Sequence, residues 1–202
     1  MSTSLQSLID DVYTLTNRPD LVAETSLAVR SATLKLHSLD NWYKDIYQTG
    51  IQWNPVDYIQ SLEYRTLVPR YRKFKYLRKY SPPTGNDMMG YDGDFFTLIT
   101  PDNTLDDYGI NRENVCYVAG AYINIRSNTQ DQYMIFGCYI QPDITELGFS
   151  SWIADEYPFA IVTEAASKVF KTIGYDEQFQ AMLLEARDWR QILIQEATAG
   201  GE

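Results

Sequence analysis

The sequence has a single histidine, His37, and only two cysteines, Cys116 and Cys138, among its 202 residues. One histidine excludes zinc sites that need two or more histidine ligands, and it argues against a Ser-His-Asp triad. The cysteines lack CxxC spacing, so they indicate small apolar strand residues of a reducing compartment. Neither GxxxxGK followed by Ser or Thr nor GxGxxG occurs in the chain. We therefore expect a protein without enzymatic activity, cofactor or metal, and with His37 as a partly exposed helix residue.

Long apolar runs are also missing, because the longest are a few residues, such as Phe159–Val162. No segment is long enough to cross a membrane. The first twelve residues contain two aspartates and no basic residue, unlike a signal peptide. The net charge of −10 argues against a general nucleic-acid binder. The sequence thus predicts a soluble protein that is intracellular when made, with no membrane partner.

Aromatic residues, in contrast, are abundant, with 16 tyrosines, eight phenylalanines and four tryptophans. Tyrosine and tryptophan are enriched at protein interfaces, since they cover apolar area while keeping a polar tip. A tyrosine-rich core is the alternative interpretation.

Helical spacing marks the N-terminal end of the chain. One apolar stripe comprises Leu5, Leu8, Ile9, Val12 and Leu15. Asn17 is placed to end that helix, and Pro19 fits the first turn of the next. The second helix has apolar positions, including Val22 and Leu27, over at least half of its circumference, which predicts packing against more than one neighbour.

The C-terminal end shows the same period. Pro158 is suited to the first turn of a helix and Gly174 to its C-terminal cap. The stripe between them comprises Phe159, Val162, Ala166, Val169 and Ile173. Asp176 can cap a further helix. Two amphipathic helices are therefore predicted at each end.

Prolines, glycines and short β-branched or aromatic runs fill the middle of the chain. The runs Phe95–Thr100, Asn114–Arg126 and Gln132–Ile140 read as strands, with Ser127–Asp131 as a hairpin turn. The pattern predicts a mainly α fold with a β insertion (α+β). Residues 1–42 and 150–198 would form a four-helix bundle around an antiparallel β-rich insertion, 43–149, and 199–202 would be a flexible tail.

Seven of the 17 basic residues fall within 15 positions, interleaved with aromatic side chains: Arg65, Arg70, Arg72, Lys73, Lys75, Arg78 and Lys79. This segment suits docking to an acidic protein surface. It equally fits single-stranded nucleic acid, or a solvated strand pair with inward tyrosines. A separate acidic group, Asp87, Asp92 and Asp94, allows an oxygen-ligand metal site but matches no EF-hand spacing and resembles a surface turn.

Both ends of the chain resemble a known family. The stretch Tyr157-Pro158-Phe159-Ala160-Ile161-Val162-Thr163-Glu164-Ala165-Ala166-Ser167-Lys168-Val169-Phe170, then Ile173-Gly174 and Glu185-Ala186-Arg187, is similar to the closing helices of bacteriophage head-to-tail adaptors. Asn17-Arg18-Pro19-Asp20-Leu21 resembles the opening helices of the podovirus adaptor group, which includes the tail tubular protein A proteins. The resemblance covers roughly the first forty and the last fifty residues.

The resemblance implies a structural virion protein at the head-tail interface, made in the host cytoplasm. Its partners would be the portal protein, a tail or nozzle protein, and further copies of itself in a ring, typically of twelve subunits. Packaged DNA would pass through an acidic lumen without specific binding. The C-terminal end, Glu196–Glu202, would reach the portal. A stopper or tail-terminator ring fits as well, and the alternative from another class is a small nucleic-acid-binding protein using residues 64–80.

Overall fold

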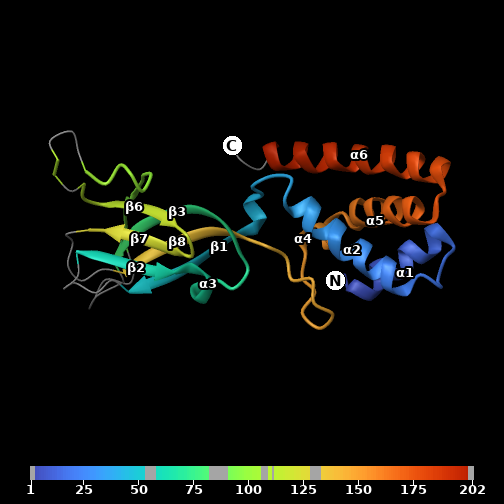
Figure 1. Ribbon diagram of the computed structural model, residues 1–202, viewed down its shortest axis with the longest axis horizontal. Coiled ribbons are helices and arrows are strands. Elements are labelled where there is room, and N and C mark those ends of the chain that lie inside the picture. Colours follow the sequence, from blue (N-terminus) through green and yellow to red (C-terminus); the bar gives the residue numbers. More distant parts are fainter. Residues whose placement is uncertain are drawn as a thin grey trace. The chain divides into compact units, whose positions relative to one another are not determined.

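The computed structural model describes residues 3–52, 58–81, 91–105, 109–110, 112–127 and 133–199. Asp87, Glu202 and most of the expected turn Ser127–Asp131 lie outside them. The chain is an α+β protein with two compact units, a helical unit of residues 1–45 and 141–202 and a sheet unit of residues 46–140 (Figure 1).

The helical unit contains α1 (Leu5–Thr16), α2 (Val22–His37), a 3-10 turn (Tyr43–Asp45), α4 (Trp152–Glu156), α5 (Pro158–Ile173) and α6 (Asp176–Ala199). Local signals set several of these boundaries. Asn17 closes α1 in the left-handed conformation, Pro158 lies in the first turn of α5, and Gly174 caps its end at φ 78°. These three boundaries agree with the sequence prediction, because each depends on the conformational preference of one residue.

The predicted four-helix bundle of N- and C-terminal helix pairs, carrying a β insertion, is wrong. Helix α5 occupies the centre of the helical unit, in contact with α1, α2, α4 and α6. Every residue from Ala160 to Ser167 is buried, so α5 is covered on all sides rather than on one stripe. Small side chains such as Ala165 and Ala166 allow neighbouring helices to approach closely. Amphipathic spacing did not reveal that one helix would be surrounded by the others.

Several residues that the sequence assigned to buried apolar stripes are exposed in the structure. Leu15 of α1, Val22 and Leu27 of α2, and Phe159 of α5 all point largely into solvent. In α1 the buried position is taken by Thr16 in place of Leu15, and the broad apolar face expected for α2 is only partly covered.

A buried carboxylate joins three helices of this unit. Glu164 of α5 accepts a hydrogen bond from Lys35 Nζ of α2 at 2.6 Å and another from Arg190 of α6. Burial alone would raise the pKa of Glu164, but these two cations outweigh it and hold that pKa below the ordinary value. The carboxylate is therefore charged and paired inside the helical unit.

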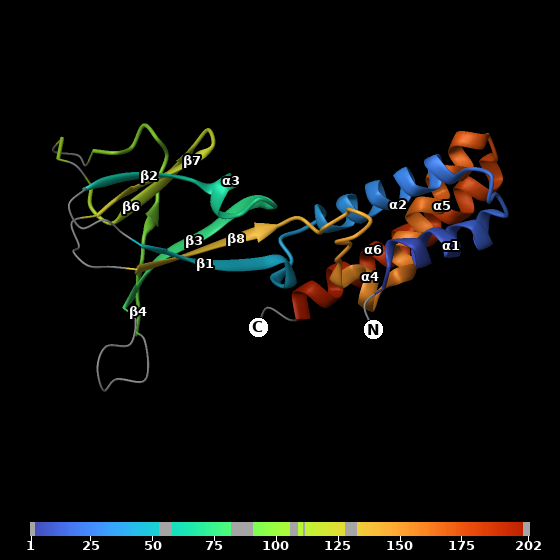
Figure 2. The same cartoon turned by 90° about the horizontal axis from the view of Figure 1, so that it is seen from below.

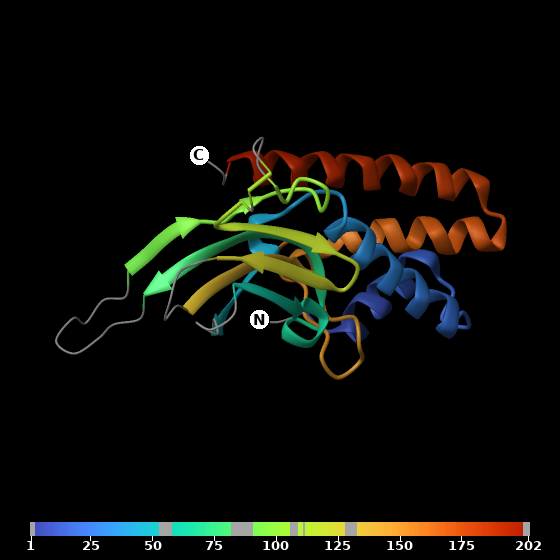
Figure 3. The ribbon, with the colours of Figure 1, turned by 60° about the vertical axis from the view of Figure 1, so that its left-hand side comes forward.

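The sheet unit contains β1 (Ile46–Gln52), β2 (Ile59–Glu63), α3 (Tyr64–Leu67), β3 (Tyr71–Ser81), β4 (Tyr91–Phe95), β5 (Thr97–Leu98), β6 (Val115–Ala119), β7 (Tyr122–Arg126) and β8 (Tyr133–Ile140). One sheet has the order β1-β8-β3-β4 and the other β2-β7-β6-β5 (Figures 2 and 3). All described pairings are antiparallel except β5 with β6. The inner faces of both sheets supply one apolar core, which includes Leu77, Ile123, Ile125, Met134 and Phe136.

The predicted hairpin between the strands at 122–126 and 133–139 is wrong. Both strands exist, but β7 pairs with β2 and β6, whereas β8 pairs with β1 and β3. The buried apolar side chains of β7 and of β8 lie on opposite sides of the shared core. Alternation identifies a strand with one buried face but does not say which sheet it joins.

The two cysteines lie on β6 and β8 and are buried free thiols, as small apolar strand residues would be. Burial raises the pKa of Cys116 to about 12 and that of Cys138 to about 11. Among the described residues, no helix has both the length and the apolar composition needed to cross a membrane.

Candidate functional site

Strand β3 presents the basic segment, and its register separates the side chains onto two faces. Phe74 lies opposite Cys138 and Leu77 opposite Phe136, so both face the core between the sheets. The register shifts between Phe74 and Tyr76, which is a bulge in β3. Beyond the bulge, Tyr76 and Arg78 lie on the outer face of the sheet. Because of the bulge, Phe74 and Leu77 both face the core although they are three residues apart, which the regular alternation of a strand does not allow.

Tyr76 lies against the backbone of β8 on this outer face. A Cβ built on Gly137 would be 2.5 Å from the Tyr76 ring, so only glycine leaves room for the ring at this position. The ring of Phe95, on β4, meets the Tyr76 ring edge-on at a centroid distance of 5.5 Å. Gln48 of β1 donates a hydrogen bond from its side-chain amide to the Tyr76 hydroxyl. Four strands thus meet at one tyrosine.

Aromatic rings hold the cations of this face. The Arg72 guanidinium lies 5.6 Å from the centroid of the Tyr139 ring, and Lys75 Nζ lies 5.5 Å from it. The Arg78 guanidinium lies 5.8 Å from the centroid of the Tyr76 ring. Cations over aromatic faces are attracted by the ring quadrupole and keep their positive charge.

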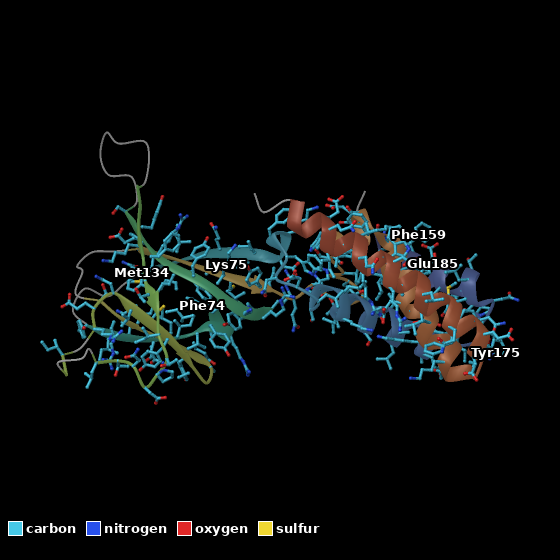
Figure 4. All side chains as sticks on the ribbon, turned by 90° about the horizontal axis from the view of Figure 1, so that it is seen from above. Phe74, Lys75, Met134, Phe159, Tyr175 and Glu185 are labelled. Atoms are coloured by element: carbon cyan, nitrogen blue, oxygen red, sulfur yellow. The ribbon has the colours of Figure 1, made fainter. Side chains whose placement is uncertain are left out.

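Lys73 completes the group, because it is exposed and lies opposite Tyr139 across the β3–β8 pair. Figure 4 shows Lys75 next to Phe74 on β3. We call the following residues the cationic-aromatic face: Arg72, Lys73, Lys75, Tyr76, Arg78, Phe95 and Tyr139.

The other predicted site residues lie elsewhere. Lys79 turns to the opposite side of β3, where its Nζ lies 5.8 Å from the ring of the buried Phe96. Arg65 of α3 and Arg70, one residue before β3, are exposed in the sheet unit outside this face. Glu196 is on α6 in the helical unit, beside a shallow hollow that includes Trp152. The predicted residues therefore do not form a single site.

Charge is divided unevenly between the two units. The helical unit has 17 acidic and eight basic residues, whereas the sheet unit has ten acidic and nine basic residues. The excess negative charge of the chain belongs almost entirely to the helical unit. The cationic-aromatic face lies on the unit whose charge is nearly balanced.

A second polar cluster, in the helical unit, was not predicted. His37 Nδ1 lies 2.8 Å from an Asp45 carboxylate oxygen, and His37 Nε2 lies 2.9 Å from Ser151 Oγ. A carboxylate only accepts, so Nδ1 donates to Asp45. The Trp152 indole nitrogen donates to the same Asp45 oxygen at 2.9 Å. His37 is 2% exposed, so its predicted partial exposure is wrong.

This cluster has the connectivity of a Ser-His-Asp triad but not its accessibility. Asp45 and Ser151 are 4% and 5% exposed, so a substrate carbonyl has no access to the serine oxygen. Ser151 Oγ also accepts from the Ala154 amide at the N-terminus of α4. The cluster joins the end of α2, the 3-10 turn and α4 as a buried hydrogen-bond network. Ser151 and Trp152 are more than 100 residues from His37 and Asp45 in sequence, and no spacing pattern signals the cluster.

Comparisons with known proteins assign no identity to either cluster. No family model matches the chain, and no curated protein matches it. Among the described residues, no group of three or more His, Cys, Asp and Glu side chains is arranged to hold a metal ion. Asp94 is exposed, whereas Asp87 and the side chain of Asp92 lie outside the described part of the chain.

The sequence indicated the cations of the face but missed its aromatic supports. Gly137, Phe95 and Tyr139 come from β8 and β4, and nothing in their spacing relates them to the basic segment. Only the pairing of strands brings them together. A glycine within an otherwise β-branched and aromatic run is the one signal of a close approach that the sequence offers at Gly137.

Proposed function

We propose that this chain is a structural assembly protein, a head-to-tail adaptor of a tailed bacteriophage, that binds acidic protein surfaces through its cationic-aromatic face. In the virion it forms a ring on the portal protein, extends the DNA channel and provides the platform for the tail or nozzle protein. It catalyses no reaction.

Exposed cations held by aromatic rings are the main support for this function. Lys73 and Lys75 are exposed, and no carboxylate of the described residues forms an ion pair with either. A partner carboxylate would meet two lysine charges that no carboxylate of the described part of the chain neutralises, which favours fast association and correct orientation. Tyrosine and arginine side chains are also enriched at the energetic centre of protein interfaces.

The helical unit supports the adaptor assignment in a second way. The residues that resemble adaptors form α5, a short stretch in the middle of α6 and the connection between α1 and α2. The strongly acidic composition of this unit suits a channel for DNA, because a wall of like charge does not retain the duplex. The closed Ser151–His37–Asp45 cluster supports a structural role rather than hydrolysis.

Capture by the portal protein encoded in the same genome tests this proposal. We expect the wild-type chain to co-purify with the portal and to appear as a ring in negatively stained images. Lys73→Glu/Lys75→Glu should lose capture while keeping its circular dichroism spectrum, because exposed substitutions usually change stability by only about 0.5 kcal/mol. Arg18→Glu/Lys171→Glu makes the same charge change in the helical unit and should be captured normally. Absence of wild-type capture would contradict the adaptor assignment.

A second candidate function is binding of single-stranded nucleic acid, favoured by the exposure of Phe95. This side chain is 63% exposed beside Tyr76 and Arg78, an arrangement on which a base can stack. Fluorescence anisotropy with an oligothymidylate of roughly 20 nucleotides tests it. Tight, salt-dependent binding that Phe95→Ala abolishes would favour this function over protein docking.

A further inference from the structure

The outer side of α6 is an exposed stripe that combines carboxylates with aliphatic side chains. On its inner side, Ala186 and Leu193 are buried against the rest of the helical unit. On the outer side, Leu184 is 59% exposed and Ile192 is 40% exposed. We call the following residues the outer stripe of α6: Glu177, Leu184, Glu185, Asp188 and Ile192. Figure 4 shows Glu185 on this helix.

The members of the outer stripe share one surface because of helical geometry. Leu184, Asp188 and Ile192 follow one another at intervals of four residues, so they lie in a row along the helix. Glu185 and Glu177 flank this row and are exposed. A helix that shows two large aliphatic side chains within a charged row has an apolar strip that a partner can cover.

We infer that the cationic-aromatic face of one copy of this chain binds the outer stripe of α6 of a second copy. This inference rests on the proposed assembly function and identifies a neighbouring copy as the acidic surface that the face binds, so that portal capture depends on the face through formation of the ring. The two surfaces are complementary in both respects: cations face carboxylates, and aromatic rings face aliphatic side chains. Both surfaces are exposed, so each is open to a partner.

Charge also favours this contact over a symmetric contact, in which two copies would bind through the same surface. Two helical units, each with nine more acids than bases, repel each other, which opposes a contact of α6 with α6. The sheet unit is nearly neutral overall and presents its exposed lysines on the cationic-aromatic face. An acidic helix therefore gains attraction only by binding the other kind of unit.

The consequence is a heterologous contact between copies. Each copy uses its cationic-aromatic face toward one neighbour and its outer stripe toward the next, so every contact leaves one free surface of each kind. Contacts of this type propagate until they close into a ring or continue as a filament.

Charge exchange between two variants tests the pairing directly. In Lys73→Glu/Lys75→Glu the face loses its net positive charge, because two of its four cations become acids. In Glu185→Lys/Asp188→Lys the outer stripe becomes basic and repels the basic face. Alone, each variant should associate at least about tenfold more weakly than the wild type. An equimolar mixture should associate again, because the unaltered acidic stripe of the first variant then meets the unaltered basic face of the second. Controls are Arg18→Glu/Lys171→Glu and Asp10→Lys/Asp11→Lys, which should associate like the wild type.

The measurement is sedimentation velocity of the full chain at about 0.1 M ionic strength, where screening acts over about 10 Å. Circular dichroism confirms that each variant is folded. A wild type that stays monomeric up to about 0.1 mM, or a mixture that does not recover, would overturn the inference. If Lys73→Glu/Lys75→Glu weakens self-association but Glu185→Lys/Asp188→Lys does not, the inference is also overturned, because the face would then bind a surface other than the outer stripe.

The outcomes separate this inference from the proposed function. If the mixture recovers self-association but the wild type does not bind the portal, the pairing stands and the adaptor assignment fails. If Lys73→Glu/Lys75→Glu loses portal capture but still self-associates, the adaptor assignment stands and the pairing fails. If Lys73→Glu/Lys75→Glu loses oligothymidylate binding but self-associates like the wild type, the face binds nucleic acid and the pairing is overturned.

Discussion

Lys35 Nζ lies 2.6 Å from a carboxylate oxygen of Glu164, a residue that is only 2% exposed. Arg190 binds the second oxygen of the same carboxylate, so α2, α5 and α6 meet at one buried charge. A buried carboxylate without partners would be strongly unfavourable. The position of α6 on α5 therefore depends on an ion pair as well as on apolar packing.

Glu164→Gln should destabilise the protein by about 3 kcal/mol, because it leaves two cations facing a neutral amide. This loss of stability is at the low end of the range for breaking buried ion pairs, because the Lys35 side chain is 44% exposed and keeps contact with water. Urea unfolding followed by circular dichroism measures it. The matched control is Glu146→Gln, whose pair with Arg30 is at the surface and should contribute no more than about 1 kcal/mol. Equal losses in both variants would contradict this account.

Stability should also fall in acid because the pKa of Glu164 is held below its ordinary value of 4.5. A lowered folded-state pKa gives stability that is fully present above the unfolded-state pKa and is lost as the pH falls through the folded-state pKa. The urea midpoint should therefore decrease as the pH is lowered below 4.5. Glu164→Gln should show a smaller decrease, and an identical pH profile would assign the effect to other carboxylates.

Gly137→Ala should disturb the cationic-aromatic face, because the new Cβ would be 2.5 Å from the Tyr76 ring. The ring must move away from β8, at a cost of about 1–3 kcal/mol. Tyr76→Ala removes the obstacle, so the double variant should be more stable than the sum of the single changes indicates. Urea unfolding of the four proteins gives this coupling. Additive losses would show that the ring does not depend on the glycine.

Ser151→Ala should reduce stability by about 1–2 kcal/mol, since it removes the cap of α4 and the partner of His37 Nε2. Thermal unfolding measures the loss. Because Ser151 is buried, a fluorophosphonate probe should not label the folded wild type. Labelling of Ser151 in the folded protein would show instead that the serine is an accessible nucleophile.

Features that depend on one residue and its neighbours were predictable from the sequence. Asn17, Pro158 and Gly174 set helix boundaries through backbone conformations that each residue favours by itself. The cations of β3 were found as a run in the sequence. The buried cysteines were recognised because their spacing fits no disulfide or metal framework.

Features that depend on which elements pack against each other were not predictable from the sequence. The apolar stripe of α5 predicted one buried face. The helix is instead covered on all sides, because its small residues let other helices approach. The alternation of β7 and β8 fitted a hairpin as well as two facing sheets. His37 shows the same limit, because its second ring nitrogen is satisfied by Ser151, 114 residues away in the sequence.

The helical unit is assembled from both ends of the chain, and this determines the order in which the protein folds during synthesis. Residues 46–140 contain all strands of both sheets, so the sheet unit can fold before α5 is translated. Leu8 of α1 and Val29 of α2, which are fully buried in the folded chain, stay accessible to water until α5 emerges from the ribosome. Contacts over such separations form late and leave apolar surface exposed to aggregation. We therefore expect the newly made N-terminal helices to be prone to aggregation until α5 is available to cover them.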